Sequence, residues 1–198
     1  IGDSAFRYCN VLTTVTIGKG VTSIGANAFF NSSSLVSIDV DADNSEYASQ
    51  DGVLFDKNQT TLIQFPAAKS GDYTIPEGVT SIGDSAFVDS ILTSVTFPDS
   101  VISMGAWAFA GCNGLSSVVL PNSFASFGEG AFSYCENLSS ITLGNNNGNI
   151  PSNSTFGDDM IEQIAARERA VSIILPLVVK YNGTLLNYGT YGGRSCHS

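Results

Sequence analysis

A fixed pattern of apolar and polar positions recurs along the chain and predicts its strands. Five segments of the form Leu-x-x-apolar-x-apolar begin at Leu12, Leu35, Leu92, Leu115 and Leu138. In each segment one residue separates the last two apolar positions, which is the period-two pattern of a strand with one buried face. The pattern therefore predicts five short β-strands, each with one face toward a core and the other toward solvent.

A second segment, of the form Ile-Gly-x-x-Ala-Phe, precedes each predicted strand. With conservative replacements allowed it starts at Ile1, Ile24, Ile82, Met104 and Phe127, at intervals of 23, 58, 22 and 23 residues. Self-similarity with a period of this length is typical of solenoids, in which each coil packs against its neighbours. We predict a β-rich, right-handed leucine-rich repeat solenoid of parallel strands, with five coils and an insert at about residues 41–77.

One phenylalanine and one small residue follow in every unit. A single coil cannot bury a phenyl ring, so the rings are expected to stack into one continuous ladder inside the solenoid. The ladder members are Phe6, Phe29, Phe87, Phe109 and Phe132, and the small residues are Cys9, Ser32, Ser90, Cys112 and Cys135. A position that accepts either Cys or Ser favours a small inward packing site over a disulfide framework or a metal site. A disulfide between Cys112 and Cys135, on adjacent coils, is the less favoured alternative.

The complete unit, Ile-Gly-x-x-Ala-Phe-x-x-Cys-x-x-Leu-x-x-Val-x-Leu-Pro, resembles the BspA-like class of leucine-rich repeats. That class occurs in surface proteins of bacteria and some protists, and the resemblance runs from Ile1 to about Leu143. It implies an exported protein, extracellular or at the cell surface, that takes part in adhesion or binds host proteins. The insert, from Asn44 to Pro76, also resembles an insert of bacterial members.

The insert and the C-terminal segment depart from the repeat. Within the insert, residues 53–55 and 62–65 flank a polar turn and predict a β-hairpin that projects from one edge of the solenoid. Residues 144–154 are rich in Asn, Gly and Ser, which favours a linker, and the apolar spacing from about Asp158 to Pro176 predicts an amphipathic helix. We thus predict a solenoid over residues 1–150 and a C-terminal cap or linker over residues 151–198.

Charge and hydropathy exclude two classes of partner. The 198 residues include 18 acidic and 8 basic side chains, for a net charge of −10. Binding to nucleic acid requires clustered Lys and Arg, so it is not expected. No apolar stretch reaches the roughly 18 to 20 residues that span a bilayer, so the chain is predicted to contain no membrane span.

Candidate catalytic and metal-ligating residues are few. The single histidine, His197, stands beside Cys196 near the end of the sequence and has no second histidine for a Ser-His-Asp site. Asp39, Asp41 and Asp43 alternate along a predicted extended segment, but the other features of a calcium loop are missing, and a solvated acidic edge is favoured. We predict no enzyme activity, no metal and no cofactor.

The outward positions of the predicted strands remain as a candidate binding face. They carry mainly hydroxyl side chains, namely Thr14, Thr16, Ser37, Asp39, Ser94, Thr96, Ser117, Ser140 and Thr142. Trp107, the sole tryptophan, is a further candidate anchor on the loop-bearing side. We predict a non-catalytic module that binds a protein or carbohydrate ligand through this face. The alternatives are a plain solvated strand surface, a structural spacer, or the repeat part of an enzyme whose catalytic region begins near Phe156.

Overall fold

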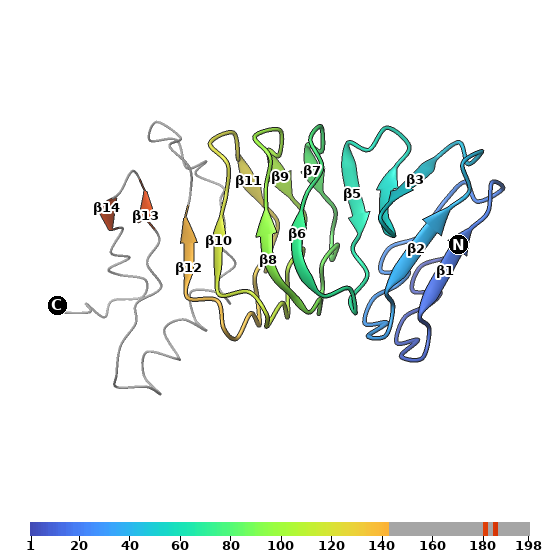
Figure 1. The fold of residues 1–198 in the computed structure, drawn as a ribbon, viewed down its shortest axis with the longest axis horizontal. Coiled ribbons are helices and arrows are strands. Elements are labelled where there is room, and N and C mark those ends of the chain that lie inside the picture. Colours follow the sequence, from blue (N-terminus) through green and yellow to red (C-terminus); the bar gives the residue numbers. More distant parts are fainter. Residues whose placement is uncertain (143–179, 182–183, 186–198) are drawn as a thin grey trace.

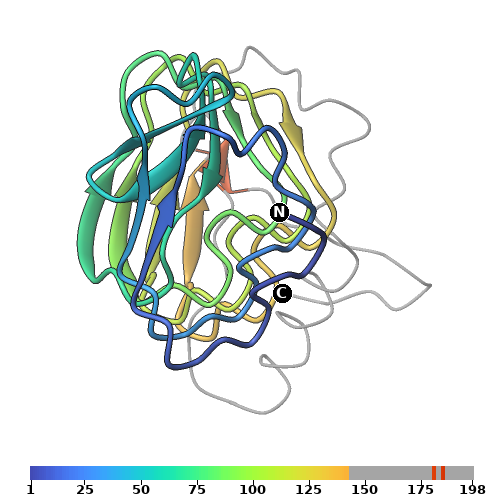
Figure 2. The same ribbon diagram turned by 90° about the vertical axis from the view of Figure 1, so that its right-hand side faces the viewer.

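The computed structural model describes residues 1–142, 180–181 and 184–185, which form a β-solenoid whose coils stack along one long axis (Figure 1). A coil has three sides, seen end-on in Figure 2: a strand face, a second sheet, and a side built of turns. The described residues contain no α-helix. They also contain no helix with the length and hydropathy needed to cross a membrane.

The strand face consists of short strands that pair in parallel between neighbouring coils. These strands are β1 (Thr14–Ile17), β2 (Ser37–Val40), β6 (Gly71–Thr74), β8 (Leu92–Thr96), β10 (Ser117–Val119) and β12 (Ser140–Thr142). The pairs are β1 with β2, β6 with β8, and β10 with β12. Ile38, Val118 and Ile141 are buried between more exposed neighbours, as the period-two pattern predicted.

The second sheet contains six strands in the order β11-β9-β7-β5-β4-β3. They are β3 (Tyr47–Gln50), β4 (Val53–Asp56), β5 (Thr61–Gln64), β7 (Ser81–Ile82), β9 (Ser103–Met104) and β11 (Ser126–Phe127). Strands β5, β7, β9 and β11 pair in parallel from coil to coil, whereas β3, β4 and β5 form an antiparallel meander. The meander comes entirely from the insert.

The insert supplies a sixth coil, so the prediction of five coils is wrong. Strand β5 pairs with β7 in the second sheet, and the chain then continues through β6, which pairs with β8 on the strand face. The predicted hairpin is confirmed as the antiparallel pair of β4 and β5. Its predicted projection from the solenoid edge is wrong, because Val53, Leu54 and Phe55 are fully buried. Strand β4 stays inside the solenoid because hydrophobic core packs against both of its faces.

Strand β4 separates two hydrophobic cores. Leu54 packs in the N-terminal core with Phe29 and Ile38, while the adjacent Val53 and Phe55 pack in the larger C-terminal core. Alternate side chains of a strand point to opposite faces, so one strand contributes to both cores. Strand β4 thus forms a wall between coil 2 and coil 3.

The phenylalanine ladder is divided by this wall, which corrects the prediction of one continuous ladder. Phe6 stacks on Phe29, with ring centroids 5.5 Å apart. A second ladder begins with Phe65 of the insert and continues through Phe87, Phe109 and Phe132, with centroid separations of 4.9, 4.3 and 5.3 Å. The rings stack within each core because every coil presents its ring at the same level of the solenoid.

The Cys or Ser position of the repeat is a hydrogen-bonding site between coils. The Cys112 thiol donates to the carbonyl oxygen of Phe87 at 3.1 Å, and the Cys135 thiol donates to that of Phe109 at 3.0 Å. In coil 2 the Ser32 hydroxyl makes the equivalent bond. Cys9, Cys112 and Cys135 are free thiols, as favoured from the sequence, and burial raises the pKa of the Cys112 thiol well above its ordinary value.

Two short strands continue the strand face beyond β12. Strand β13 (Lys180–Tyr181) pairs in parallel with β12, and β14 (Thr184–Leu185) pairs with β13 in the antiparallel direction. The predicted linker over residues 144–154, the predicted helix from Asp158 to Pro176, and the Cys196–His197 pair lie outside the described residues.

Candidate functional site

The strand face brings the predicted binding residues into registered rows. In coils 1 and 2, Thr14 stands beside Ser37 and Thr16 beside Asp39. The same arrangement recurs at the other end of the array, with Ser117 beside Ser140 and Val119 beside Thr142. Ser94 and Thr96 lie in β8 between these two groups, and both are exposed.

Strand β6 adds two members that the sequence prediction missed. Asp72 pairs with Ser94, and Thr74 pairs with Thr96. The Thr93 hydroxyl donates to Asp72 Oδ1 at 2.9 Å. Hydrogen bonds from Ser94 and Thr93 hold the pKa of the Asp72 carboxyl below its ordinary value, so the face carries a negative charge at this point. The alternation Tyr73-x-Ile75 is the sequence signal that could have identified both residues. It puts these two side chains inward, so Asp72 and Thr74 beside them point outward.

The insert divides the strand face into two parts. The turn between β3 and β4 lies against β2, where the Ile38 amide donates to the carbonyl oxygen of Gly52 at 2.8 Å. A Cβ atom at Gly52 would lie only 2.5 Å from Ser37 Oγ, so the turn can approach this closely only as glycine. The larger part of the face therefore begins at β6 and continues through β8, β10 and β12 to the short strands β13 and β14.

Asp39, Asp41 and Asp43 are all exposed, as a solvated acidic edge requires, but they do not alternate along one extended segment as predicted. Asp39 lies in β2, but the strand ends at Val40, and Asp41 and Asp43 belong to the following turn. Asp41 Oδ1 accepts a hydrogen bond from the Asp43 amide at 2.9 Å, which stabilises the turn. Within the described part of the chain no group of three or more His, Cys, Asp or Glu side chains could hold a metal ion.

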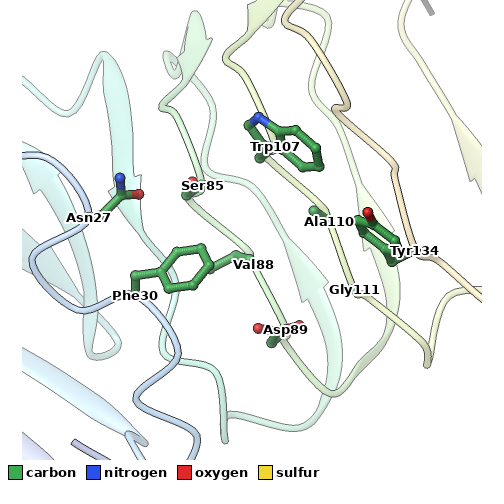
Figure 3. A pocket seen from close by; sticks show the side chains of 9 residues that line it. All are labelled: Asn27, Phe30, Ser85, Val88, Asp89, Trp107, Ala110, Gly111 and Tyr134. Atoms are coloured by element: carbon green, nitrogen blue, oxygen red, sulfur yellow. The ribbon is translucent and has the colours of Figure 1, made fainter. Parts of the chain in front are cut away.

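Trp107 lies on the turn side and lines a groove of about 420 Å³, which we call the aromatic groove (Figure 3). Its lining residues come from coil 2 and coils 4 to 6, and are Asn27, Phe30, Ser85, Val88, Asp89, Trp107, Ala110, Gly111 and Tyr134. Phe30 forms one wall, and Trp107 with Tyr134 forms the opposite wall. The buried side chains of Val88 and Ala110 lie between them.

The aromatic groove exists because coil 3 has a shortened turn side. Leu62 and Ile82 are register partners, yet three residue steps lead from Leu62 to Phe65 where five lead from Ile82 to Phe87. The turn that carries Asn27 in coil 2 and Ser85 in coil 4 therefore has no counterpart in coil 3. The missing turn leaves space between the aromatic side chain of Phe30 and the next coils.

Left-handed backbone conformations project the groove side chains outward. Trp107 has φ +57° and Tyr134 has φ +59°, values that bulky residues rarely adopt. The two rings stack with centroids 6.3 Å apart and planes 15° apart. Trp107 lies against Gly130, where a Cβ atom would be 3.1 Å from the indole ring. The glycine on the next coil thus makes room for the tryptophan.

Asp89 supplies the carboxylate of the groove. Partial burial raises the pKa of this carboxyl above its ordinary value, although the residue as a whole is exposed. Among the described residues that line the groove, none is a lysine or an arginine. Beside the groove, the guanidinium of Arg7 lies 5.0 Å from the ring centroid of Phe30 and 4.8 Å from that of Tyr8.

Comparison with protein families identifies the repeat. The family model described as the BspA type leucine rich repeat region matches residues 1–70 and 63–174, in six copies. The chain belongs to this family. Six is also the number of coils in the described part of the BspA-type chain. No curated protein matches the chain at a significant level.

Solved bacterial structures share the fold of the BspA-type chain. A leucine-rich repeat protein from Eubacterium ventriosum is 29% identical with a TM-score of 0.64, and a leucine rich cell surface protein from Faecalibacterium prausnitzii is 32% identical with a TM-score of 0.54. The pneumococcal vaccine antigen PcpA is 29% identical with a TM-score of 0.58. These matches cover 66%, 66% and 68% of the chain, which spans 36%, 41% and 40% of the respective structures.

Proposed function

We propose that this chain is a non-catalytic module of a bacterial surface protein, and that it binds a protein partner through the strand face. Membership of the BspA-type family supports the interaction role, because leucine-rich repeat arrays present extended binding surfaces. The surface location is supported by the similar structure from Faecalibacterium prausnitzii, which is described as a cell surface protein.

The observation that carries the proposal is the register of the outward residues from coil to coil. Asp72 beside Ser94, and Thr74 beside Thr96, continue a row of short polar side chains whose members are largely exposed. Short side chains lose little rotamer entropy when a partner covers them, so a flat hydroxyl surface can be covered at low entropic cost. Val119 adds an apolar contact, with 63% of its surface exposed.

A protein partner suits this face better than a carbohydrate. The described outward positions of the face carry no aromatic ring on which a sugar could stack. The exposed polar groups of the strand face extend across several strands, which matches the extended polar surface of a protein interface. The fixed charge of Asp72 supplies one point of electrostatic selection.

The test compares two doubly substituted chains. The 198-residue chain is immobilised and used to capture solubilised host cell-surface proteins, and each captured protein is then purified for affinity measurement. The variant with Ser94→Arg and Thr96→Arg places two long cations on the strand face and is expected to weaken binding by at least about 30-fold. The control carries Thr22→Arg and Ala125→Arg, at exposed positions away from the face, and is expected to bind as the parent does.

Circular dichroism and urea unfolding of both variants must match the parent, so that a loss of binding reports the surface. Equal binding by the two variants would contradict the proposal. The absence of any captured protein would instead favour a spacer role.

A further inference from the structure

The aromatic groove combines ring faces with a single carboxylate. Phe30 stands on one wall and Trp107 and Tyr134 on the other, and Figure 3 shows the Asp89 carboxylate between the two walls. The face of an aromatic ring carries negative electrostatic potential, so it attracts cations. None of the described lining residues is basic, and the one guanidinium beside the groove, that of Arg7, lies over the Phe30 ring from the adjacent coil.

We infer that the aromatic groove binds a cationic side chain, an arginine or lysine on an extended segment of a protein partner. The net charge of −10 favours the approach of such a segment over an acidic one. The groove is separate from the strand face, because its residues lie in the turns of the coils. The inference therefore stands or falls separately from the proposed function.

The neighbouring coil provides an internal example of the same contact. Arg7 occupies the position of coil 1 that Phe30 occupies in coil 2, and its guanidinium lies over both Tyr8 and Phe30. Rings on this side of the solenoid thus already hold a guanidinium. The Asp89 side chain is exposed, so a cation can reach its carboxylate directly.

A carbohydrate is a less suitable occupant of the groove. A sugar ring stacks on aromatic residues, but its hydroxyl groups also require several directed hydrogen-bond partners. The polar groups of the lining are the side chains of Asn27, Ser85 and Asp89, the indole N–H of Trp107 and the hydroxyl of Tyr134. Of these, the Ser85 side chain is buried. One accessible carboxylate among ring faces matches a single cationic head group more closely.

The sole tryptophan of the chain makes the groove directly observable. Because Trp107 lines the groove, its fluorescence reports occupancy without a label. The 198-residue chain is titrated at constant ionic strength with the capped peptide Gly-Gly-Arg-Gly-Gly, and with the same peptide carrying citrulline, which has a similar shape and no charge. The arginine peptide is expected to give a saturable change in the millimolar range, and the citrulline peptide to bind at least about tenfold more weakly.

Variants separate the groove from nonspecific attraction. Asp89 has φ +53°, which asparagine also tolerates, so Asp89→Asn removes the charge without straining the backbone. This variant is expected to bind the arginine peptide about tenfold more weakly. Asp72→Asn, on the strand face, is the matched control and is expected to retain the parent affinity. Phe30→Leu provides a second groove variant, which is expected to weaken binding several-fold.

Three results would overturn the inference. One is a fluorescence response that stays linear with arginine peptide up to about 10 mM in the folded chain. A second is equal affinity for the arginine and citrulline peptides, or equal loss in Asp89→Asn and Asp72→Asn. The third is a saturable response to lactose or another neutral saccharide and none to the arginine peptide.

Discussion

The phenyl rings of Phe87 and Phe109 stack in adjacent coils with centroids 4.3 Å apart and planes 10° apart. Both residues are fully buried, and each ring has a further ring of the ladder on its other side. Phe6, in coil 1, is only partly buried and stacks on one ring. Position along the solenoid should therefore determine how much each ring contributes to stability.

Phe109→Ala is expected to lower the free energy of unfolding by about 3 to 5 kcal/mol, because it leaves a cavity between two rings in the C-terminal core. Phe6→Ala is expected to cost roughly 1 to 2 kcal/mol, since its ring is already partly solvated. Urea unfolding followed by circular dichroism measures both values. Equal losses for the two variants would show that the rings are not stacked as an ordered ladder.

The glycine of Ile-Gly allows adjacent coils to approach closely. A Cβ atom at Gly105 would lie 2.6 Å from the backbone nitrogen of Asp84, whereas one at Gly83 would lie 3.1 Å from the carbonyl oxygen of Leu62. A Cβ atom at Gly2 would contact nothing within 4 Å. The backbone cannot rotate away as a side chain can, so the cost of added bulk should follow these distances.

Gly105→Ala is therefore expected to destabilise the chain by about 2 to 3 kcal/mol, and Gly83→Ala by less than about 2 kcal/mol. Gly2→Ala serves as the control and is expected to be neutral within about 0.5 kcal/mol. Thermal and urea unfolding give the ranking. A reversed order, with Gly83→Ala the most damaging, would contradict the observed coil spacing.

Because β4 lies between the two cores, adjacent side chains of this strand are expected to stabilise different ends of the solenoid. Leu54→Ala opens the N-terminal core, and Phe55→Ala opens the C-terminal core. Hydrogen exchange measured by mass spectrometry should accelerate mainly in peptides from residues 1–40 in the first variant. In the second it should accelerate mainly in peptides from residues 75–120. The same exchange pattern in both variants would show that the two cores unfold as one unit.

The phenol of Tyr73 is expected to make the folded chain less stable at alkaline pH. Burial raises the pKa of its phenol, so the folded chain holds the neutral form while the unfolded chain ionises at about pH 10. The neutral phenol's contribution to stability is complete below that pH and is lost progressively as the pH rises above it. The slope is expected to be below the full value of about 1.4 kcal/mol per pH unit, because the ring is partly solvated.

The measurement is urea unfolding between about pH 8 and pH 11. Tyr73→Phe should flatten the decline in the free energy of unfolding above about pH 10. Tyr8→Phe, at an exposed tyrosine, serves as the control. A decline that is as steep in Tyr73→Phe as in the parent would assign the alkaline effect to other groups.

The strands of the regular coils were predictable because two independent patterns coincide in them. Period-two alternation marks each strand, and the recurrence of Ile-Gly-x-x-Ala-Phe places the strands side by side in parallel. Coil 3 escaped this reasoning because Leu62–Phe65 retains the phenylalanine but has lost the Ile-Gly and Ala positions. Its strand-face segment also differs, since Tyr73 fills the inward position that Val95 fills in the next coil.

The sequence identified Trp107 as an unusual residue but not the groove that it lines. The groove results from a turn that is absent in coil 3, and a missing turn leaves no motif in the sequence. Phe30 and Asp89 are distant from each other along the chain and come together only because coil 3 takes a shorter path between them. Such a hollow depends on the relative lengths of neighbouring coils, which only the assembled fold reveals.

The strand face and the aromatic groove both depend on the insert forming coil 3. In the described fold the ring of Phe65 lies 4.9 Å from that of Phe87. In a five-coil arrangement, with the insert outside the solenoid, Phe29 would occupy that place. The most direct test is nuclear Overhauser spectroscopy of the chain with labelled phenylalanine rings, with Phe65→Leu used for assignment. A contact between Phe65 and Phe87 is predicted, and a contact between Phe29 and Phe87 would contradict the account.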